Sequence, residues 1–245
     1  MIPTSSARRR HFCCLLGLGL SLAPAPALAQ AYQCRAPREL AMPRPVQPDG
    51  PRRVSPITGY TLAISWSPEF CRGGKAAKDP DNLQCNGQIG RFGFVLHGLW
   101  PESGQGKYPQ WCSVTPRPTV AELKANLCMT PVPWLIEHEW AKHGSCMAAR
   151  PADYFKVSAI LWNSLRLPDA DRLSRQPGLT AGDLRAAFAG VNPGIPNKAI
   201  GIRISNGGWL REIQICYDRK FLPTACENRK FGPGNTVPLK IWRGL

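Results

Sequence analysis

The histidines are the first residues whose types and spacing suggest chemistry. The 245-residue chain holds four of them, and three lie in two short segments. His97 opens the run His-Gly-Leu-Trp-Pro at residues 97–101, while His138 and His143 belong to the run His-Glu-Trp-Ala-Lys-His-Gly at residues 138–144. Because histidine titrates near neutral pH, one imidazole can accept a proton while another donates one. The two segments are therefore candidates for acid–base catalysis.

The second segment is predicted to be helical, which gathers its ionisable side chains on one face. Counted at about 100° per residue from His138, Lys142 lies at about 40° and Glu139 at about 100°. His143 follows at about 140°, so all four groups share one side of the helix. A solvated charged face is the ordinary alternative, but two histidines beside a tryptophan are poor choices for solubility alone.

A zinc site on this helix is the other alternative. Zinc-binding helices carry His-Glu-x-x-His, which places both imidazoles on one face. Here the second histidine comes one residue later, which splays the imidazoles, and Lys142 would place a cation beside the metal. We therefore expect no metal and no cofactor.

Two groups that titrate near neutrality, a fixed cation and a carboxylate suit the transfer of a phosphoryl group to a neighbouring 2′-hydroxyl. One histidine would take the proton from the 2′-hydroxyl, and a second would give a proton to the leaving 5′-oxygen. A lysine would balance the charge that builds on phosphorus. RNA supplies this nucleophile and DNA lacks it, so RNA is the expected substrate.

The N-terminus is predicted to be a secretory signal peptide, residues 1–29. Three arginines at residues 8–10 precede an apolar stretch at residues 12–22, and Ala27-Leu28-Ala29 has the small-x-small pattern of a cleavage site. The alternative is a short buried helix at the edge of a domain. Arg9-Arg10 also resembles a twin-arginine signal, so the export route stays open. No second apolar run of about 18 residues follows, and we expect no membrane span.

Removal of residues 1–29 leaves a basic chain with an even number of cysteines. The formal charge falls from +15 to +12 because three arginines are lost, and eight of the ten cysteines remain. A charge of this sign favours a polyanionic partner, with solubility as the alternative. The remaining cysteines lie at least ten positions apart, which disfavours zinc binding and predicts up to four disulfides in an exported protein, periplasmic or extracellular.

The elements that must position these residues follow from periodicity and capping signals. Strands are predicted at four places: 60–66, 92–96 (ending at His97), 200–204 and 210–217. The last two are joined by the hairpin signal Asn206-Gly207, and residues 67–90 are expected to form a loop. Helices are predicted at four places: 119–127, 130–143, 152–167 and 180–188. Residues 237–242 are assigned to an additional edge strand.

Strands at both ends of the chain with helices between them predict an α+β fold. We expect a central antiparallel β-sheet with several α-helices in a disulfide-stabilised single domain at residues 30–245. Residues 30–58 are rich in proline and arginine and are expected to form an irregular leader, tied down through Cys34.

Residues 97–101 and 138–146 resemble the two signatures of the T2 ribonucleases, with Ser145 where that family carries threonine. Looser similarity extends from Tyr60 to Cys226. The resemblance implies an endoribonuclease that cleaves single-stranded RNA with little base specificity through a 2′,3′-cyclic phosphate, acting as a monomer without metal. The alternative from another class is a catalytically silent protein of the same fold that binds RNA or another polyanion. The intact histidine pair favours the enzyme.

The resemblance also implies a role for each residue of the two segments. His143 would be the general base and His97 the general acid, an assignment that the residues alone leave open. His138 would hold the phosphate, while Glu139 and Lys142 would stabilise the pentacoordinate phosphorus.

Three further residues match positions at which the family stacks and hydrogen-bonds the first base: Trp100, Glu102 and Tyr108. An aromatic face stabilises a stacked base by about 1–3 kcal/mol without demanding a sequence. For Trp100 the alternative is a tryptophan of the core. Glu102 stands where aspartate is often found, and Ser65 stands where relatives often carry glutamine, so the base preference stays open.

The family pattern implies two disulfides directly. Cys112–Cys146 would join the two active-site segments, and Cys216–Cys226 would close a C-terminal hairpin extension. Four cysteines then remain: Cys34, Cys71, Cys85 and Cys128. Similarity favours a bridge from residue 85 to residue 128, which leaves 34 with 71, and a local bridge from 71 to 85 is the alternative.

Overall fold

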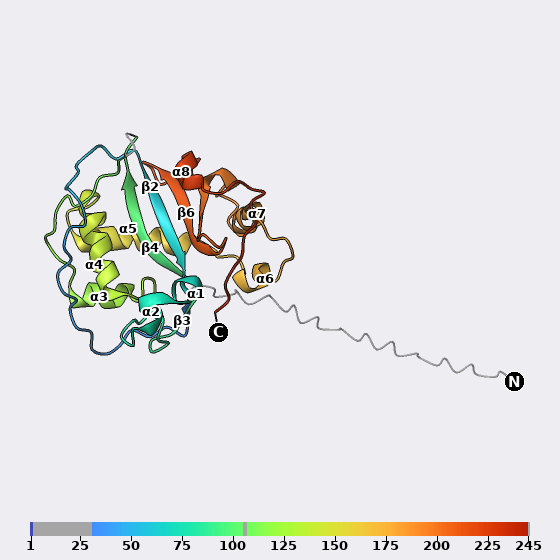
Figure 1. The fold of residues 1–245 in the computed structure, drawn as a ribbon, viewed down its shortest axis with the longest axis horizontal. Coiled ribbons are helices and arrows are strands. Elements are labelled where there is room, and N and C mark those ends of the chain that lie inside the picture. The colour runs from blue at the N-terminus through green and yellow to red at the C-terminus, as the bar shows by residue number, and fades with distance from the viewer. Residues whose placement is uncertain (2–30, 105–106, 245) are drawn as a thin grey trace.

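A four-stranded antiparallel sheet lies at the centre of the part of the chain that the computed structural model describes, which is Met1, residues 31–104 and residues 107–244 (Figure 1). Its strands, in spatial order, are β4 (Phe94–Glu102), β2 (Gly59–Trp66), β6 (Leu210–Asp218) and β5 (Ile200–Ile204). Leu62, Ala63 and Ile64 of β2 are fully buried, as expected for a strand with neighbours on both edges. The predicted α+β class and antiparallel sheet are confirmed, whereas the predicted signal peptide lies outside the described residues.

The pairing of β2 with β4 contains a β-bulge at His97. Ala63 pairs with Gly98 and Ile64 pairs with Leu96, so His97 is an additional residue on β4. Bulges re-aim a side chain and are common beside active sites. The prediction that the strand ends at His97 is wrong, because the ladder resumes beyond the bulge and continues to Glu102.

The helices cover the sheet from several sides. Their bounds are α1 (Ser67–Phe70), α2 (Gly74–Lys78), α3 (Val120–Asn126), α4 (Pro133–Lys142), α5 (Pro151–Ser164), α6 (Ala170–Ser174), α7 (Ala181–Val191) and α8 (Asn228–Phe231). In Figure 1, α5 runs behind the strands, α3 and α4 lie on the β4 side, and α6 and α7 lie on the opposite side. A single buried hydrophobic cluster includes Leu62 of β2, Leu123 of α3, Trp140 of α4 and Phe188 of α7, which supports one domain.

The predicted capping signals are confirmed, whereas one predicted loop, one helix start and one edge strand are corrected. Thr119 and Thr180 each close a capping box at the start of α3 and α7. The predicted loop at 67–90 contains α1 and α2. Helix α4 begins at Pro133 rather than near residue 130, because proline is favoured at a first helical position and Val132 is the N-cap. Residues 237–242 form isolated bridges instead of a strand.

The disulfides correct one part of the expected framework. Cys112–Cys146 and Cys216–Cys226 are present as expected. The pairing favoured by similarity, Cys85 with Cys128, is wrong. The bridges are Cys34–Cys128 and Cys71–Cys85, with Cα–Cα distances of 5.7 and 5.5 Å.

The path of the leader explains this pairing. Its short strand β1 (Ala31–Tyr32) pairs with β3 (Arg91–Phe92), and the backbone N–H of Arg35 donates to the carbonyl of Ile89. These contacts place Cys34 near Cys128, which follows α3, so the leader is anchored through Cys34 as expected. The rest of residues 33–58 forms no helix or extended strand.

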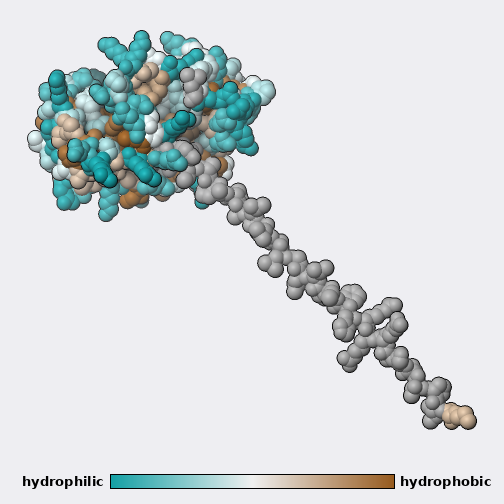
Figure 2. All heavy atoms as spheres, turned by 90° about the horizontal axis from the view of Figure 1, so that it is seen from below, coloured by the Kyte–Doolittle hydropathy of each residue, from teal (hydrophilic) through white to brown (hydrophobic). Residues whose placement is uncertain are grey.

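Figure 2 shows one face of the molecule coloured by hydropathy. Hydrophilic residues cover most of this face, with small separate apolar areas between them. No helix within the described ranges combines the length and the apolar character that crossing a bilayer requires.

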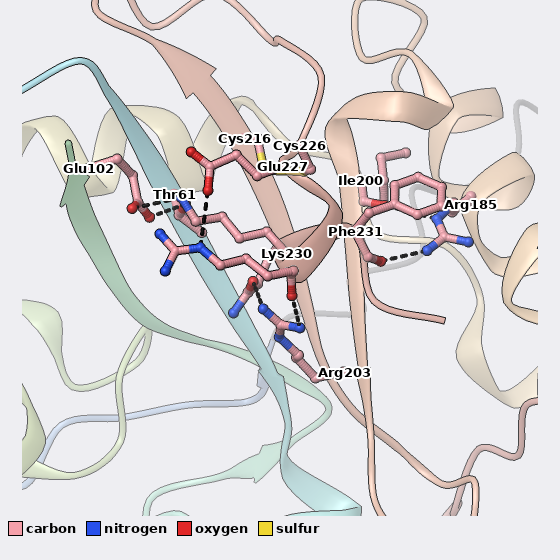
Figure 3. The surroundings of a disulfide bond; sticks show 12 residues. Thr61, Glu102, Arg185, Ile200, Arg203, Cys216, Cys226, Glu227, Lys230 and Phe231 are labelled. Carbon is pink, nitrogen blue, oxygen red and sulfur yellow. Dashed lines mark hydrogen bonds and ion pairs between the residues drawn. A yellow bond between two sulfur atoms is a disulfide. The ribbon is translucent and has the colours of Figure 1, made fainter. Parts of the chain in front are cut away.

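Arg185 of α7 is a buried cation that ties the C-terminal segment to the sheet (Figure 3). Its side chain is 0% exposed. The guanidinium donates to the carbonyls of Ile200, Phe231 and Pro233 and to the side chain of Asn235, over 2.7–2.9 Å. All of these acceptors lose hydrogen bonds if the guanidinium is removed.

We predict that Arg185→Leu lowers the free energy of unfolding by at least about 3 kcal/mol, because four acceptors, including the buried carbonyl of Ile200, lose a charged donor at once. Urea denaturation followed by circular dichroism measures this loss. The matched control is Arg175→Leu, which removes an exposed arginine paired with Asp171 and should cost less than about 1 kcal/mol. Equal losses in the two variants would contradict the structural role of Arg185.

Candidate active site

A cleft of about 1120 Å³ opens over one face of the sheet and the start of α4. His97 and Trp100 of β4 line it, together with Glu212 of β6 and Arg203 of β5. Trp134 at the start of α4 and Phe70 of α1 add aromatic walls, with 49% and 47% of their surface exposed. The cleft is wide enough for an extended ligand with flat, apolar groups.

His97 lies between two carboxylates. Its Nδ1 is 2.7 Å from Oε2 of Glu212, and its Nε2 is 3.7 Å from Oε1 of Glu139. Burial by itself would lower the pKa of His97, but the hydrogen bond to Glu212 and the charges of both carboxylates outweigh it and raise the pKa to about 9. His97 is therefore protonated at neutral pH.

His143 lies in the opposite electrostatic environment. It is the C-cap of α4, just before the 3₁₀ turn η1 (Gly144–Cys146), and is 6% exposed. Burial lowers the pKa of His143 well below its usual value, and the nearby positive charge of Lys142 lowers it further. Its Nδ1 has no hydrogen-bond partner among the described residues. His143 is thus neutral at pH 7 and able to accept a proton.

Trp100 links the two histidines and Glu139. Its ring lies 5.1 Å from the ring of His97 and 5.6 Å from that of His143. The indole N–H donates to Oε2 of Glu139 over 2.7 Å. Burial raises the pKa of Glu139 to about 7, although His97 and the Trp100 hydrogen bond act in the opposite direction.

Gly98 makes this close approach possible. A Cβ at this position would lie 1.9 Å from Oε2 of Glu139 and 2.8 Å from the indole nitrogen of Trp100. Gly144 is required for a similar reason, since a Cβ there would lie 2.6 Å from the ring of Tyr154. The glycine of each histidine segment is therefore explained by side-chain packing.

Lys142 is held by a residue of the leader. Its Nζ lies 2.6 Å from Oδ2 of Asp49, and the indole of Trp111 donates to Oδ1 of the same carboxylate over 3.0 Å. The hydrogen bond from Lys142 lowers the pKa of Asp49, against a smaller effect of burial. Nothing in the irregular, proline-rich sequence around Asp49 indicated this contact.

His138 lies between two tryptophans. Its ring stacks on Trp134 at 4.9 Å and meets the edge of Trp111 at 5.4 Å. Burial lowers the pKa of His138, and the charge of Lys142 lowers it further. The four residues of the helix that were predicted to share one face do lie close together. Lys142 interacts electrostatically with each of His138, Glu139 and His143, and all three of these also interact with His97.

Of the two remaining base-contact candidates, the structure brings only Tyr108 to the histidines. The ring of Tyr108 lies 5.6 Å from that of His143. Glu102 is 9% exposed, accepts a hydrogen bond from Thr61 over 2.6 Å and pairs with Lys230 at 2.6 Å (Figure 3). Its carboxylate is engaged on the sheet, so the expected contact with a base has no support in this geometry.

The bridge between Cys112 and Cys146 fixes the segment that carries Tyr108 against the end of α4. Beside the bridge, the backbone N–H of Trp111 donates to the carbonyl of Lys142 over 2.8 Å. This disulfide therefore holds Tyr108 and Trp111 in place next to His143. Among the described residues, no group of three or more His, Cys, Asp or Glu side chains is arranged to hold a metal ion.

Comparison with known proteins agrees with the two motifs. Residues 58–177 match the Ribonuclease T2 family. A ribonuclease of Aeromonas hydrophila is 32% identical over 172 residues, which cover 66% of this chain and 72% of the relative. The chain belongs to the Ribonuclease T2 family. A probable ribonuclease of Haemophilus influenzae is a further relative, 31% identical over 193 residues that cover 74% of this chain and 65% of that protein.

Solved structures extend the T2 assignment to the fold. RNase NT in complex with 5′-AMP aligns with a TM-score of 0.57 at 18% identity, covering 76% of this chain and 98% of that one. Trichomaglin, described as an S-like ribonuclease, aligns with a TM-score of 0.56 at 20% identity over the same shares. The family resemblance of the two histidine motifs is thereby confirmed at the level of sequence and of fold.

Glu212 is, with Asp49, a site residue of this T2 chain that sequence reasoning missed. It lies on β6, where residues 212 and 214 alternate with the buried isoleucines 213 and 215. The sequence predicts a strand at these residues and indicates no site in it. Glu212 and Gln214 are nevertheless 9% and 5% exposed, and a polar face buried in this way indicates a site.

We predict that the two central histidines titrate far apart in the free protein. The midpoint for His97 should lie near pH 9 and that for His143 well below 6.5. Imidazole signals recorded by NMR from about pH 4 to about pH 10 measure both midpoints, with single histidine variants for assignment. Midpoints in the reverse order would contradict the electrostatic description of the site.

Proposed function

We propose that this T2-family chain is an endoribonuclease that cleaves single-stranded RNA through a 2′,3′-cyclic phosphate, with His143 as the base and His97 as the acid. The observation that carries the proposal is the electrostatic opposition of the two histidines. Carboxylates flank His97 on two sides, whereas Lys142 faces His143. At neutral pH each histidine is therefore already in the protonation state that its role requires.

The reaction follows from these protonation states. Neutral His143 removes the proton of the 2′-hydroxyl, and the resulting oxygen attacks phosphorus to form the new P–O2′ bond. The P–O5′ bond breaks, and the leaving oxygen takes the proton of His97. Proton transfer of this kind contributes about 10²–10⁴-fold each to a rate.

The remaining residues of the cluster act on the phosphate. Lys142 and His138 would bind its oxygens, and the ammonium of Lys142 would offset the charge of the pentacoordinate phosphorus. Glu139, whose Oε1 lies 3.7 Å from Nε2 of His97, would help to stabilise the pentacoordinate phosphorus together with Lys142. All these groups come from one copy of the chain, so the mechanism requires only a monomer.

Low base specificity is supported by the walls of the cleft. Trp134 and Phe70 present exposed aromatic faces, and every base can stack on such a face. The carboxylate of Glu102, which was expected to contact the first base, is engaged with Lys230. We therefore propose stacking as the main contact with the bases.

The disulfides support a compartment outside the cytoplasm. Four disulfides join the cysteines of the described residues, which is typical of a secreted or extracellular protein. We propose that residues 1–29 are removed on export and that the enzyme acts in the periplasm or outside the cell.

A dinucleotide assay tests the chemistry. The mature chain should cleave an RNA dinucleotide, leave its 2′-deoxy analogue intact and keep its rate in the presence of a chelator. His97→Ala and His143→Ala should each lower kcat by at least about 100-fold, because each removes a proton-transfer partner. Cleavage of the deoxy analogue or loss of activity with chelator would overturn the mechanism. Failure to cleave either substrate would favour the silent RNA-binding alternative.

The pH dependence of kcat/KM tests the assignment of acid and base. Activity needs His143 deprotonated, so the acidic limb should lie below pH 6.5. It also needs His97 protonated, so activity should fall again as the pH rises through about 9. The histidines interact, so each limb reports the cluster. An acidic limb above pH 7 would contradict the proposed roles.

A further inference from the structure

Glu212 of β6 binds the Nδ1 edge of the His97 ring, and Glu139 lies beside its Nε2 edge. Its Oε2 lies 2.7 Å from Nδ1 of His97 and accepts a hydrogen bond from the hydroxyl of Ser65 over 3.3 Å. Its Oε1 accepts a hydrogen bond from the amide of Gln214 over 2.7 Å. Both oxygens of this nearly buried carboxylate are therefore bound, and only His97 brings a titratable proton to it.

The donors around Glu212 are themselves held in place. The carbonyl oxygen of the Gln214 amide accepts a hydrogen bond from Arg203 over 3.1 Å, which turns the NH₂ group toward Glu212. Arg203 in turn donates to the carbonyl of Arg229 over 2.6 Å (Figure 3). A chain of hydrogen bonds thus crosses from β5 through β6 to the bulge of β4.

This network keeps Glu212 ionised. Burial by itself would raise the pKa of Glu212, but the hydrogen bond and charge of His97, with the donors Gln214 and Ser65, outweigh it and lower the pKa. A carboxylate held in this way stabilises a neighbouring imidazolium and fixes its orientation.

His97 experiences several other charges. The titratable and charged groups that face it from β6, from α4 and from the end of α4 are Glu212, Arg211, Glu139, His138 and His143. Arg211 acts against protonation, and Glu139 acts for it from the Nε2 side at 3.7 Å. Glu212 is the only one of these with a direct hydrogen bond to the ring.

We propose that Glu212 is a positioning residue for catalysis: it holds His97 through Nδ1, so that the ring stays protonated and presents its Nε2 proton to the leaving oxygen. Gln214 and Arg203 support this role by orienting the carboxylate. The inference rests on the proposed function in so far as His97 is the acid, but the contact itself is testable without RNA.

The principal test is Glu212→Gln, which keeps the size of the side chain and removes its charge. The NMR titration midpoint of His97 should fall by at least one pH unit, a tenfold weaker proton affinity. The alkaline limb of kcat/KM should move to lower pH by a similar amount. At about pH 10, above both midpoints, the variant should therefore lose about tenfold or more of its activity, and at about pH 6 far less, since His97 is protonated there in either protein.

Three further variants make the result specific. Glu212→Asp retains the charge and should keep most of the His97 midpoint and of the alkaline limb. Asp153→Asn removes an exposed carboxylate that pairs with Arg150 and should change neither. Gln214→Leu should shift the midpoint in the same direction as Glu212→Gln but by less, because the charge remains while one orienting donor is lost.

The outcomes separate this inference from the proposed function. An unchanged His97 midpoint in Glu212→Gln, or an activity loss equal at all pH values, would overturn the positioning role. A lowered midpoint in a chain that cleaves no RNA even as the wild type would uphold the contact and overturn the proposed function. Thermal unfolding of each variant shows whether the protein measured is folded, and the midpoint is read on folded protein alone.

Discussion

The hydrogen bond between Nδ1 of His97 and Glu212 joins β4 to β6 across the intervening strand β2, and the site is arranged around it. It exists because the β-bulge places His97 out of the regular alternation of β4. The carboxylate on one side and Glu139 on the other make a protonated imidazole stable in a largely buried position. Without this pair, burial would drive His97 toward its neutral form, and the two central histidines would be alike.

The contrast with His143 arises from where the two residues lie in their secondary-structure elements. His97 lies at a strand irregularity beside acids, while His143 caps α4 beside Lys142. The ring of Trp100 lies near both, and its indole N–H donates to Glu139, so one side chain contacts the two histidines and the carboxylate. The close packing at Gly98 shows how little room this arrangement leaves.

The disulfides and the leader hold other segments of the chain against the site. The bridge between Cys112 and Cys146 fixes the loop that carries Tyr108 and Trp111 to the end of α4. The leader, anchored through Cys34, brings Asp49 to Lys142. A segment with no regular structure therefore supplies a charge to the centre of the site, which is possible because covalent and backbone contacts hold it on both sides.

The sequence by itself determined the antiparallel α+β class, the helix caps and the histidine–lysine cluster, since these depend on local periodicity and on residues within one helix. It also indicated the family, through the resemblance of its two histidine motifs. His138, Glu139, Lys142 and His143 could be placed together because helix geometry fixes their relative positions. The tertiary structure alone decided the partners from distant segments. Glu212 is 115 positions from His97 and Asp49 is 93 positions from Lys142, and no local pattern encodes which strands pair. For the same reason similarity favoured the wrong partner for Cys128, and the protonation of the two histidines became assignable only once their charged neighbours were known.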